Sequence, residues 1–153
     1  MTRHDSIFDI TYSYHLENMH SILTGRIDRA ITFIIIAAGC SVFASLNHYA
    51  LFGVLIACLS ICQVVYQFGR NSGISEDQAK RYKLLIIEVE ECDDAELNNR
   101  YKSLHSLDTS PWGILCNAAF KRACIVLGLP SGTPELTFME KCFACLAGDL
   151  PRE

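Results

Sequence analysis

The chain has 153 residues, of which 50% are hydrophobic and 20% are charged, with a formal net charge of −4 and a pI near 5.7. This acidic balance gives no broad cationic field, so we expect no general nucleic-acid binding. A localised basic pocket for a small anion is compatible with the same balance.

The first element that we expect is an amphipathic helix within residues 1–29. Apolar side chains recur there at nearly helical spacing from Ser6 to Leu23: Ile7, Ile10, Tyr14, Met19, Ile22 and Leu23. The pattern favours a cytoplasmic helix that leads into the next element or lies along the membrane surface. We expect Gly25 to allow a bend between the two elements.

A stretch without Asp, Glu, Lys or Arg extends from Ala30 to Gly69 and is broken only by Asn47-His48-Tyr49. A bilayer core of about 30 Å needs about 20 apolar residues per helix, and about 17 suffice. The stretch therefore predicts two membrane spans, 30–46 and 50–69, joined by a tight turn. The alternative is a hairpin inside a soluble core, for which the remaining chain offers too little covering material.

Positive charge predicts the orientation of this hairpin. Arg26 and Arg29 precede the first span, Arg70 follows the second, and the turn has no fixed charge. Lys and Arg are retained on the cytoplasmic side. We therefore expect both termini in the cytoplasm and the hairpin in a bacterial inner membrane, which places five cysteines where thiols stay reduced: Cys92, Cys116, Cys124, Cys142 and Cys145.

The second span carries a polar stripe. Ser60, Gln63 and Gln67 follow Gly53 and Ile56 at spacings of three and four residues, which places all five on one face of a helix. Glutamines that face lipid would leave their amides unsatisfied. Two interpretations stay open: the stripe bonds helices together, or it lines an aqueous path in an oligomer of about four or more chains.

Small residues form a second stripe, on the first span. Ala37, Ser41 and Ser45 repeat every four residues, a pattern that allows close helix approach in membranes. Together with Gly53 of the second span, they are the residues that we expect at helix-packing contacts.

Residues 70–153 predict a cytoplasmic helical domain. Asn71-Ser72-Gly73 predicts a break, and Ser75-Glu76-Asp77-Gln78 has the form of a capping box. The helix that follows carries its apolar face on Ala79, Tyr82, Leu85, Ile86 and Val89, and ends near Cys92. Asp93 or Asp94 caps another helix, with Leu97, Tyr101, Leu104 and Leu107 at helical spacing.

Two further helices complete the domain. Ser110-Pro111 starts a helix from Trp112 to about Leu127, which ends at Gly128. Lys121 and Arg122 in its middle exclude a third span, because each costs about 2.5–3.5 kcal/mol at a bilayer centre. Thr133-Pro134 starts the last helix, and Gly148 ends it. The fold class is all-α: a membrane hairpin with an N-terminal helix and a C-terminal helical bundle.

No pattern of a catalytic or metal site stands out. The chain has no P-loop, no G-x-S-x-G and no H-E-x-x-H, so we expect neither an enzyme nor a cofactor. Cys142 and Cys145 form a lone C-x-x-C without the further ligands that zinc requires. We interpret them as small buried apolar residues, with a redox switch as the alternative.

The order of these elements resembles the SLATT family of small two-span bacterial proteins. The resemblance lies in the arginines before a compact hairpin and in patterns across residues 7–128: Tyr82-Lys83-Leu84-Leu85, Leu97-x3-Tyr101-x2-Leu104 and Ser110-Pro111-Trp112. It implies a pore-forming effector of bacterial conflict systems, which works beside nucleotide-generating or nucleotide-sensing partners.

The plan is also similar to that of two-span membrane effectors of CRISPR defence, whose cytoplasmic bundles bind cyclic oligoadenylate. That similarity implies candidate phosphate contacts at five cations: Lys80, Arg81, Lys83, Lys121 and Arg122. The alternative is that they are ordinary surface cations. For the whole chain we expect either a gated, oligomeric effector that permeabilises the membrane in antiphage defence, or a membrane-anchored adaptor without conduction.

Overall fold

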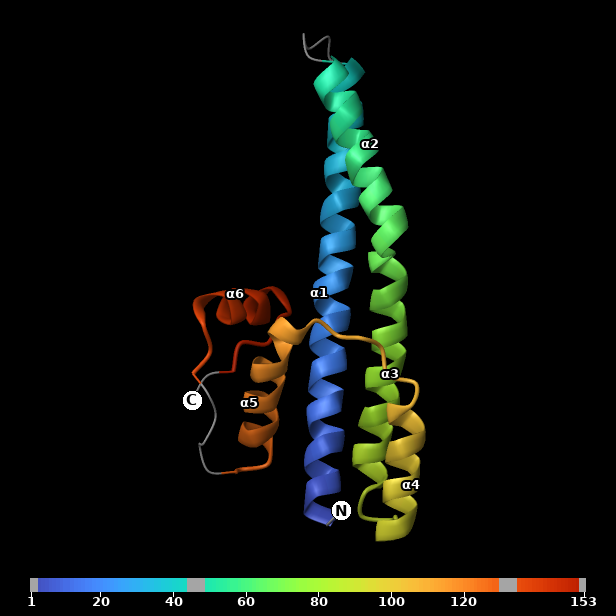
Figure 1. Ribbon diagram of the computed structural model, residues 1–153, viewed down its shortest axis with the longest axis vertical. Helices are drawn as coiled ribbons and strands as arrows, with labels where there is room; N and C mark the ends of the chain where they lie inside the picture. The colour runs from blue at the N-terminus through green and yellow to red at the C-terminus, as the bar shows by residue number, and fades with distance from the viewer. Residues whose placement is uncertain (1–2, 44–48, 130–134, 152–153) are drawn as a thin grey trace.

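The computed structural model describes residues 3–43, 49–129 and 135–151 (Figure 1). Its elements are α1 (Arg3–Phe43), α2 (Tyr49–Tyr66), α3 (Phe68–Glu88), α4 (Asp94–His105), the 3₁₀ helix η1 (Gly113–Leu115), α5 (Cys116–Val126) and α6 (Phe138–Leu146). Within these ranges there is no strand, which confirms the all-α class.

Helix α1 is the axis of the molecule. It runs for 41 residues without interruption, so the predicted amphipathic helix and the start of the predicted first span are one element. The predicted bend at Gly25 is wrong. A Cβ at this position would lie 2.8 Å from Ser72 Oγ, so the glycine allows close approach of α3 rather than a change of direction.

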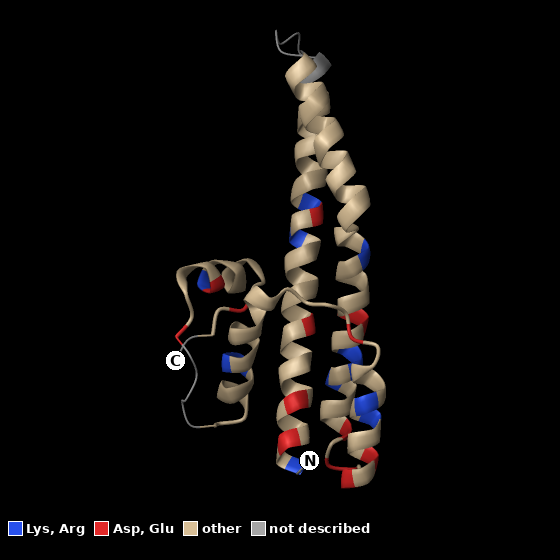
Figure 2. Cartoon of the chain, in the orientation of Figure 1, with Lys and Arg blue, Asp and Glu red and all other residues tan. Residues whose placement is uncertain are grey.

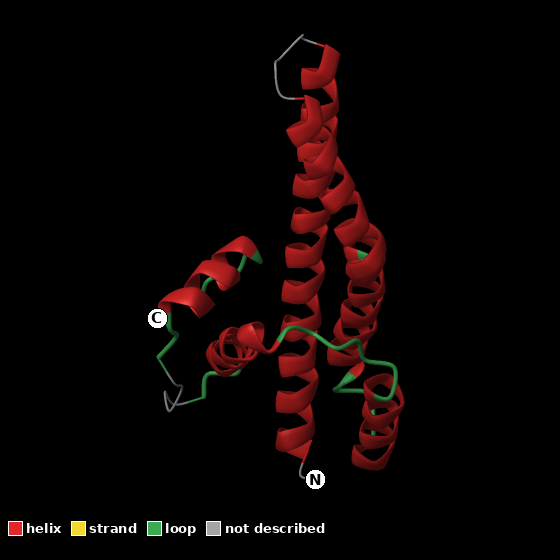
Figure 3. Ribbon diagram, turned by 45° about the horizontal axis from the view of Figure 1, so that its top comes forward, coloured by secondary structure: helices red, strands yellow, loops and turns green. Residues whose placement is uncertain are grey.

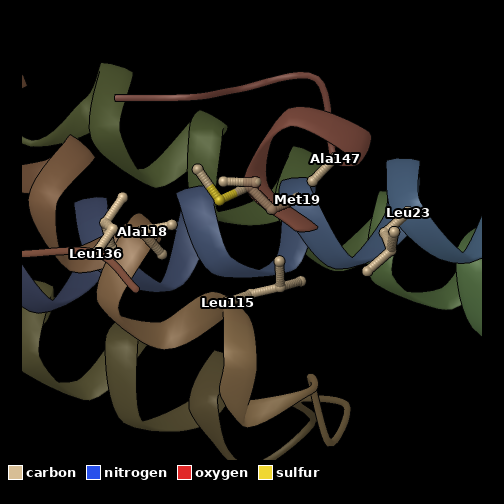
Figure 4. Packing of buried hydrophobic residues seen from close by; sticks show 8 residues of the cluster. Met19, Leu23, Leu115, Ala118, Leu136 and Ala147 are labelled. Atoms are coloured by element: carbon tan, nitrogen blue, oxygen red, sulfur yellow. The ribbon is translucent and has the colours of Figure 1, made fainter. Parts of the chain in front are cut away.

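Two hydrophobic cores flank the lower half of α1, with α5 and α6 on one side and α3 and α4 on the other (Figures 1 and 3). Met19 and Leu23 are buried against α5 and α6 (Figure 4). Ile10 is buried against Tyr82 of α3 and Leu97 of α4. This half of α1 is therefore the centre of the bundle and does not lie along a membrane surface.

The upper half of the molecule is an apolar arm. Among the described residues, one helix is long and apolar enough to cross a membrane: it begins at Ala50, and its most apolar window has a mean hydropathy of 2.0 with no residue buried. Figure 2 shows charged residues from the bottom of the molecule up to the base of the arm and none on the described part of the arm above it. Of the predicted first span, α1 covers residues 30–43; residues 44–48, with most of the predicted turn, lie outside the described ranges.

The chain changes direction at Gln67, between α2 and α3. Gln67 has a left-handed backbone with φ 47°, and its N–H still donates to the Gln63 carbonyl at 3.0 Å. Helix α3 then begins at Phe68. The predicted break at residues 71–73 is wrong, and so is the capping box, because Ser75 and Gln78 are buried in the middle of α3.

The remaining helices follow the predicted order with shifted starts. The predicted apolar face of α3 is confirmed by the burial of Tyr82, and Leu97 of α4 is buried too. The helix expected from Trp112 begins with η1 and ends at Val126, and Gly128 follows in the turn with φ 64°. Helix α6 starts after Thr137, which forms a capping box with Glu140. The predicted start at residues 133–134 lies outside the described ranges, and α6 ends before Gly148 as predicted.

Candidate functional site

At the base of the apolar arm, Gln63 bridges α2 to α1. Its Nε2 donates to Asp28 Oδ1 at 3.1 Å and to Thr32 Oγ1 at 2.9 Å. An amide nitrogen carries two N–H groups, so both of its donors have partners on α1. We call Asp28, Thr32 and Gln63 the hairpin clamp.

The start of α3 meets the hairpin clamp at Asp28. A Cβ on Gly69 would lie 3.1 Å from Asp28 Oδ2, so any larger residue here would require the Asp28 carboxylate to move by a few tenths of an ångström. The left-handed turn at Gln67 separates Gln63 from Gly69 and lets both face the same carboxylate. Asp28 is therefore the point at which α1 meets the end of α2 and the beginning of α3.

The other residues of the polar stripe are placed differently. Gln67 is exposed, and its Oε1 accepts a hydrogen bond of 3.0 Å from Arg70. Ser60 is half-buried on α2. Among the described residues, no neighbouring atom lies within 4 Å of a Cβ built on Gly53, and its role in helix packing stays a prediction.

The small-residue stripe of α1 is described in part. Ala37 is exposed on the arm, and Ser41 lies in α1 two residues before its end. Ser45 lies outside the described residues. Whether these residues pack against other helices stays a prediction.

A buried polar group ties α1 to α3 and to the loop before η1. Glu17 of α1 is 1% exposed, and its Oε2 accepts a 2.8 Å hydrogen bond from Thr109 Oγ1. Ser75 Oγ lies 3.0 Å from the same hydroxyl and 2.9 Å from His20 Nδ1. We call Glu17, His20, Ser75 and Thr109 the junction network, because it joins three segments that are distant in the sequence.

Burial shapes the ionisation of the junction network. It raises the pKa of the Glu17 carboxyl, while the hydrogen bonds from Thr109 and Ser75 act in the opposite direction. Burial also lowers the pKa of His20, which favours a neutral imidazole. A polar network whose members are all bonded fixes one arrangement of the surrounding helices, so we interpret this one as a structural lock.

Asp108 extends this lock toward α3 and α4. Its carboxylate accepts hydrogen bonds from Tyr82 Oη at 2.6 Å and from Gln78 Nε2 at 2.8 Å. His105 Nδ1 lies 2.7 Å from its other oxygen. Burial and the Asp108 charge raise the pKa of Tyr82, so its hydroxyl stays a donor at neutral pH.

Sequence reasoning missed both the hairpin clamp and the junction network with its extension at Asp108. Asp28 stands between two arginines, which conceals any role other than charge, although Thr32 one turn later signals a polar face at the edge of an apolar stretch. Ser75 and Gln78 share a helical face with Tyr82, and this spacing is the signal that the capping-box interpretation concealed. Nothing in the sequence around Glu17 indicates burial or its partner at Thr109.

The candidate phosphate contacts are distributed over two helices. On α3, Lys80 pairs with Glu76 at 2.7 Å and Arg81 with Asp77 at 2.9 Å. On α5, Arg122 pairs with Asp149. These carboxylates offset much of the charge that a phosphate would meet. The remaining two candidates are Lys83, which is exposed on α3, and Lys121, which is half-buried on α5.

An apolar groove lies beside Lys83. It encloses about 370 Å³ and is lined from three elements, with Ile7 and His15 on α1, Ile86 on α3 and Val126 on α5. Burial and the Arg122 charge lower the pKa of His15 to about 4, so the groove faces a neutral imidazole at physiological pH.

The eight cysteines are all free thiols. Cys142 is half-buried and Cys145 exposed on α6, so the prediction that both are buried is wrong. Among the residues that the structure describes, no group of three or more His, Cys, Asp or Glu side chains is placed to hold a metal ion.

Comparisons of the chain with family models, with curated proteins and with solved structures gave no match. The SLATT resemblance therefore stays a prediction from the layout.

Proposed function

We propose that this chain is an oligomeric effector of a bacterial inner membrane, with both termini in the cytoplasm and two spans, which its cytoplasmic helices gate. In this proposal, assembly or opening permeabilises the membrane and arrests the cell during antiphage defence. The class of trigger that the family resemblance implies is a nucleotide second messenger or a partner protein of the defence system.

The observation that carries the proposal is the continuity of α1. One helix contains Glu17 of the junction network and Asp28 of the hairpin clamp, and these residues are about 16 Å apart along its axis. A change in the packing of the bundle therefore reaches the membrane arm without an intervening flexible segment. The unburied apolar surface of α2 supports the membrane assignment.

The hairpin clamp suggests how such a gate works. In a single chain, Gln63 is bonded to α1 and turned inward. If the bundle moves α1 relative to α2, the amide is released and joins Ser60 and Gln67 on the stripe that an oligomer would present to water. The closed and open states then use the same side chain with different partners.

The test is depolarisation of cells on induced expression. Gln63→Leu with Gln67→Leu removes the amides, and we expect the depolarisation to fall because the stripe becomes apolar. Cys58→Leu with Cys62→Leu is the matched control, since both cysteines are exposed on α2 away from the stripe. Unchanged or stronger depolarisation by a well-folded double glutamine variant would remove the stripe from the pathway.

A second candidate, a membrane-anchored adaptor, is favoured by the same clamp. Gln63 is satisfied within one hairpin, so pairing of this amide requires no further copies. Replacing residues 30–69 with an unrelated two-span anchor separates the candidates: an adaptor keeps its cellular effect, whereas an effector loses it.

A further inference from the structure

Helix α6 has two apolar faces, and the bundle covers one of them. Ala144 is buried in the core beside α1, and the Phe143 ring meets Trp112 at 6.4 Å between centroids. On the other face, Phe138 is 79% exposed, Met139 56% and Leu146 53%. Met139 follows Phe138 by one residue, and Leu146 follows Met139 by seven residues and Phe138 by eight. At helical spacing these three side chains lie on one side of α6.

The position of α6 relates this open face to the apolar arm. Arg26 of α1 donates to the Leu146 carbonyl at 2.6 Å, which fixes the C-terminal end of α6 beside α1. Arg26 precedes Ala30, the start of the uncharged stretch, by about 6 Å along the helix axis. Helix α6 therefore lies at the base of the arm.

The orientation of α6 is equally specific. It lies crosswise to α1, with α5 and η1 on the side away from the arm (Figure 1). Its covered face contacts α1, η1 and α5, so the open face turns toward the half of the molecule that carries the arm. A helix parallel to a bilayer surface, beside a helix that enters the bilayer, has this arrangement.

We propose that the open face of α6 docks on the surface of the lipid bilayer that holds the hairpin. Interfacial helices bury their apolar face about 5–10 Å into the boundary between headgroups and acyl chains. Exposed cations on α6 and near the base of the arm complement anionic headgroups: Arg29, Arg70 and Lys141. The inference rests on the proposed membrane insertion of the hairpin. It adds a second membrane contact through α6, a helix that does not cross the bilayer.

This docking fixes how the bundle stands on the membrane. The open face of α6 meets lipid while Phe143 on its covered face contacts Trp112, whose ring also meets Phe68 at the start of α3. The membrane surface is thereby joined, through three aromatic side chains, to the point where α3 begins.

The experiment uses single tryptophans in the full-length chain. In a Trp112→Phe background, the reporters are Phe138→Trp on the open face, Leu55→Trp in α2 and Leu84→Trp, a position exposed on α3. Each variant is placed in vesicles of phosphatidylethanolamine and phosphatidylglycerol, with and without acyl chains brominated near the carbonyl end. Met139→Trp is a second open-face reporter in case the first variant folds poorly.

We expect bromine to reduce emission from positions 138 and 55 and to leave position 84 unchanged. Quenching at position 55 without quenching at 138 and 139 overturns the docking of α6 and leaves the membrane hairpin standing. A blue shift at 138 without quenching shows that a second copy covers the face, which also overturns it. No quenching at position 55 refutes the membrane insertion itself.

Discussion

His15 is a buried base whose neighbours oppose its protonation. The side chain is 14% exposed, and its Nδ1 lies 4.0 Å from Asp149 Oδ2, but Asp149 is already paired with Arg122. Burial, and then the Arg122 charge, lower the pKa of His15 from 6.5 to about 4. In the unfolded chain the imidazole titrates at its ordinary value, so acid protonates the unfolded state first.

Acidification should therefore destabilise the bundle through His15. The stabilisation from its neutral form is complete above pH 6.5 and is lost as the pH falls toward 4. Between pH 7 and pH 5 the loss is about 2 kcal/mol. We expect denaturant unfolding of the solubilised chain to lose this amount in the parent and less in His15→Gln. His4→Gln, at an exposed histidine, is the control, and an equal pH response in all three chains would contradict the assignment.

At the scale of elements, Gln67 sets the angle between α2 and α3. Its φ of 47° is a conformation that costs residues other than glycine about 1–2 kcal/mol. The strain is held by the flanking backbone hydrogen bonds from Gln67 N–H to Gln63 and from Asn71 N–H to Gln67. Leucine meets the same backbone cost as glutamine, so the Gln67→Leu change in the depolarisation test alters side-chain chemistry alone.

Glycine at position 67 should stabilise the chain. We expect Gln67→Gly to raise the free energy of unfolding by about 1 kcal/mol, because glycine adopts positive φ freely. Val65→Gly, in the regular part of α2, should lower it by a similar amount. Denaturant unfolding in a mild detergent measures both. A loss at position 67 equal to that at 65 would show that the left-handed turn is not populated.

The sequence reveals the order of the helices better than their ends. Apolar spacing alone identifies the buried face of α3, because Tyr82 repeats with Leu85 on one side of a helix. It misplaces the start of α3, because Ser75 bonds to His20 and Thr109 rather than to its own backbone. Such partners come from tertiary structure, which local patterns do not encode.

Glycine and threonine illustrate the same limit in two ways. Gly25 suggests a bend, but its role is to allow Ser72 to approach, and a single sequence does not distinguish these uses. Thr137 and Glu140 carry a complete capping box that could have been recognised. The Thr133-Pro134 signal, four residues earlier, predicts a different start. For the candidate site, the periodicity of α2 identifies Gln63 as a residue that needs a partner. The sequence does not identify Asp28 as that partner, because the pairing depends on the register between α1 and α2.

At the scale of the whole molecule, α1 contributes to two separate cores. Met19 belongs to the core shared with α5 and α6, and Ile10 to the core shared with α3 and α4. The two clusters share no buried residue. Each pair of helices is therefore held on α1 by its own apolar side chains.

This separation predicts that the two sides loosen independently. Met19→Ala should cost about 2–5 kcal/mol and speed hydrogen exchange in α5 and α6, while amides of α4 stay protected. Leu97→Ala, at an equally buried position, should have the opposite pattern. Peptide-resolved hydrogen exchange in detergent measures both variants. Equal acceleration on both sides in either variant would show that the bundle opens as one unit.

The central place of α1 has a consequence for synthesis on the ribosome. Helix α1 is translated before the helices that flank it, and both of its flanks are completed by segments made later, the Met19 flank by residues up to Ala147. A nascent chain halted after α3 has closed the Ile10 flank in part and has left Met19 and Leu23 uncovered. If the apolar arm enters a bilayer as proposed, insertion during synthesis begins while the Met19 and Leu23 side of α1 is still uncovered.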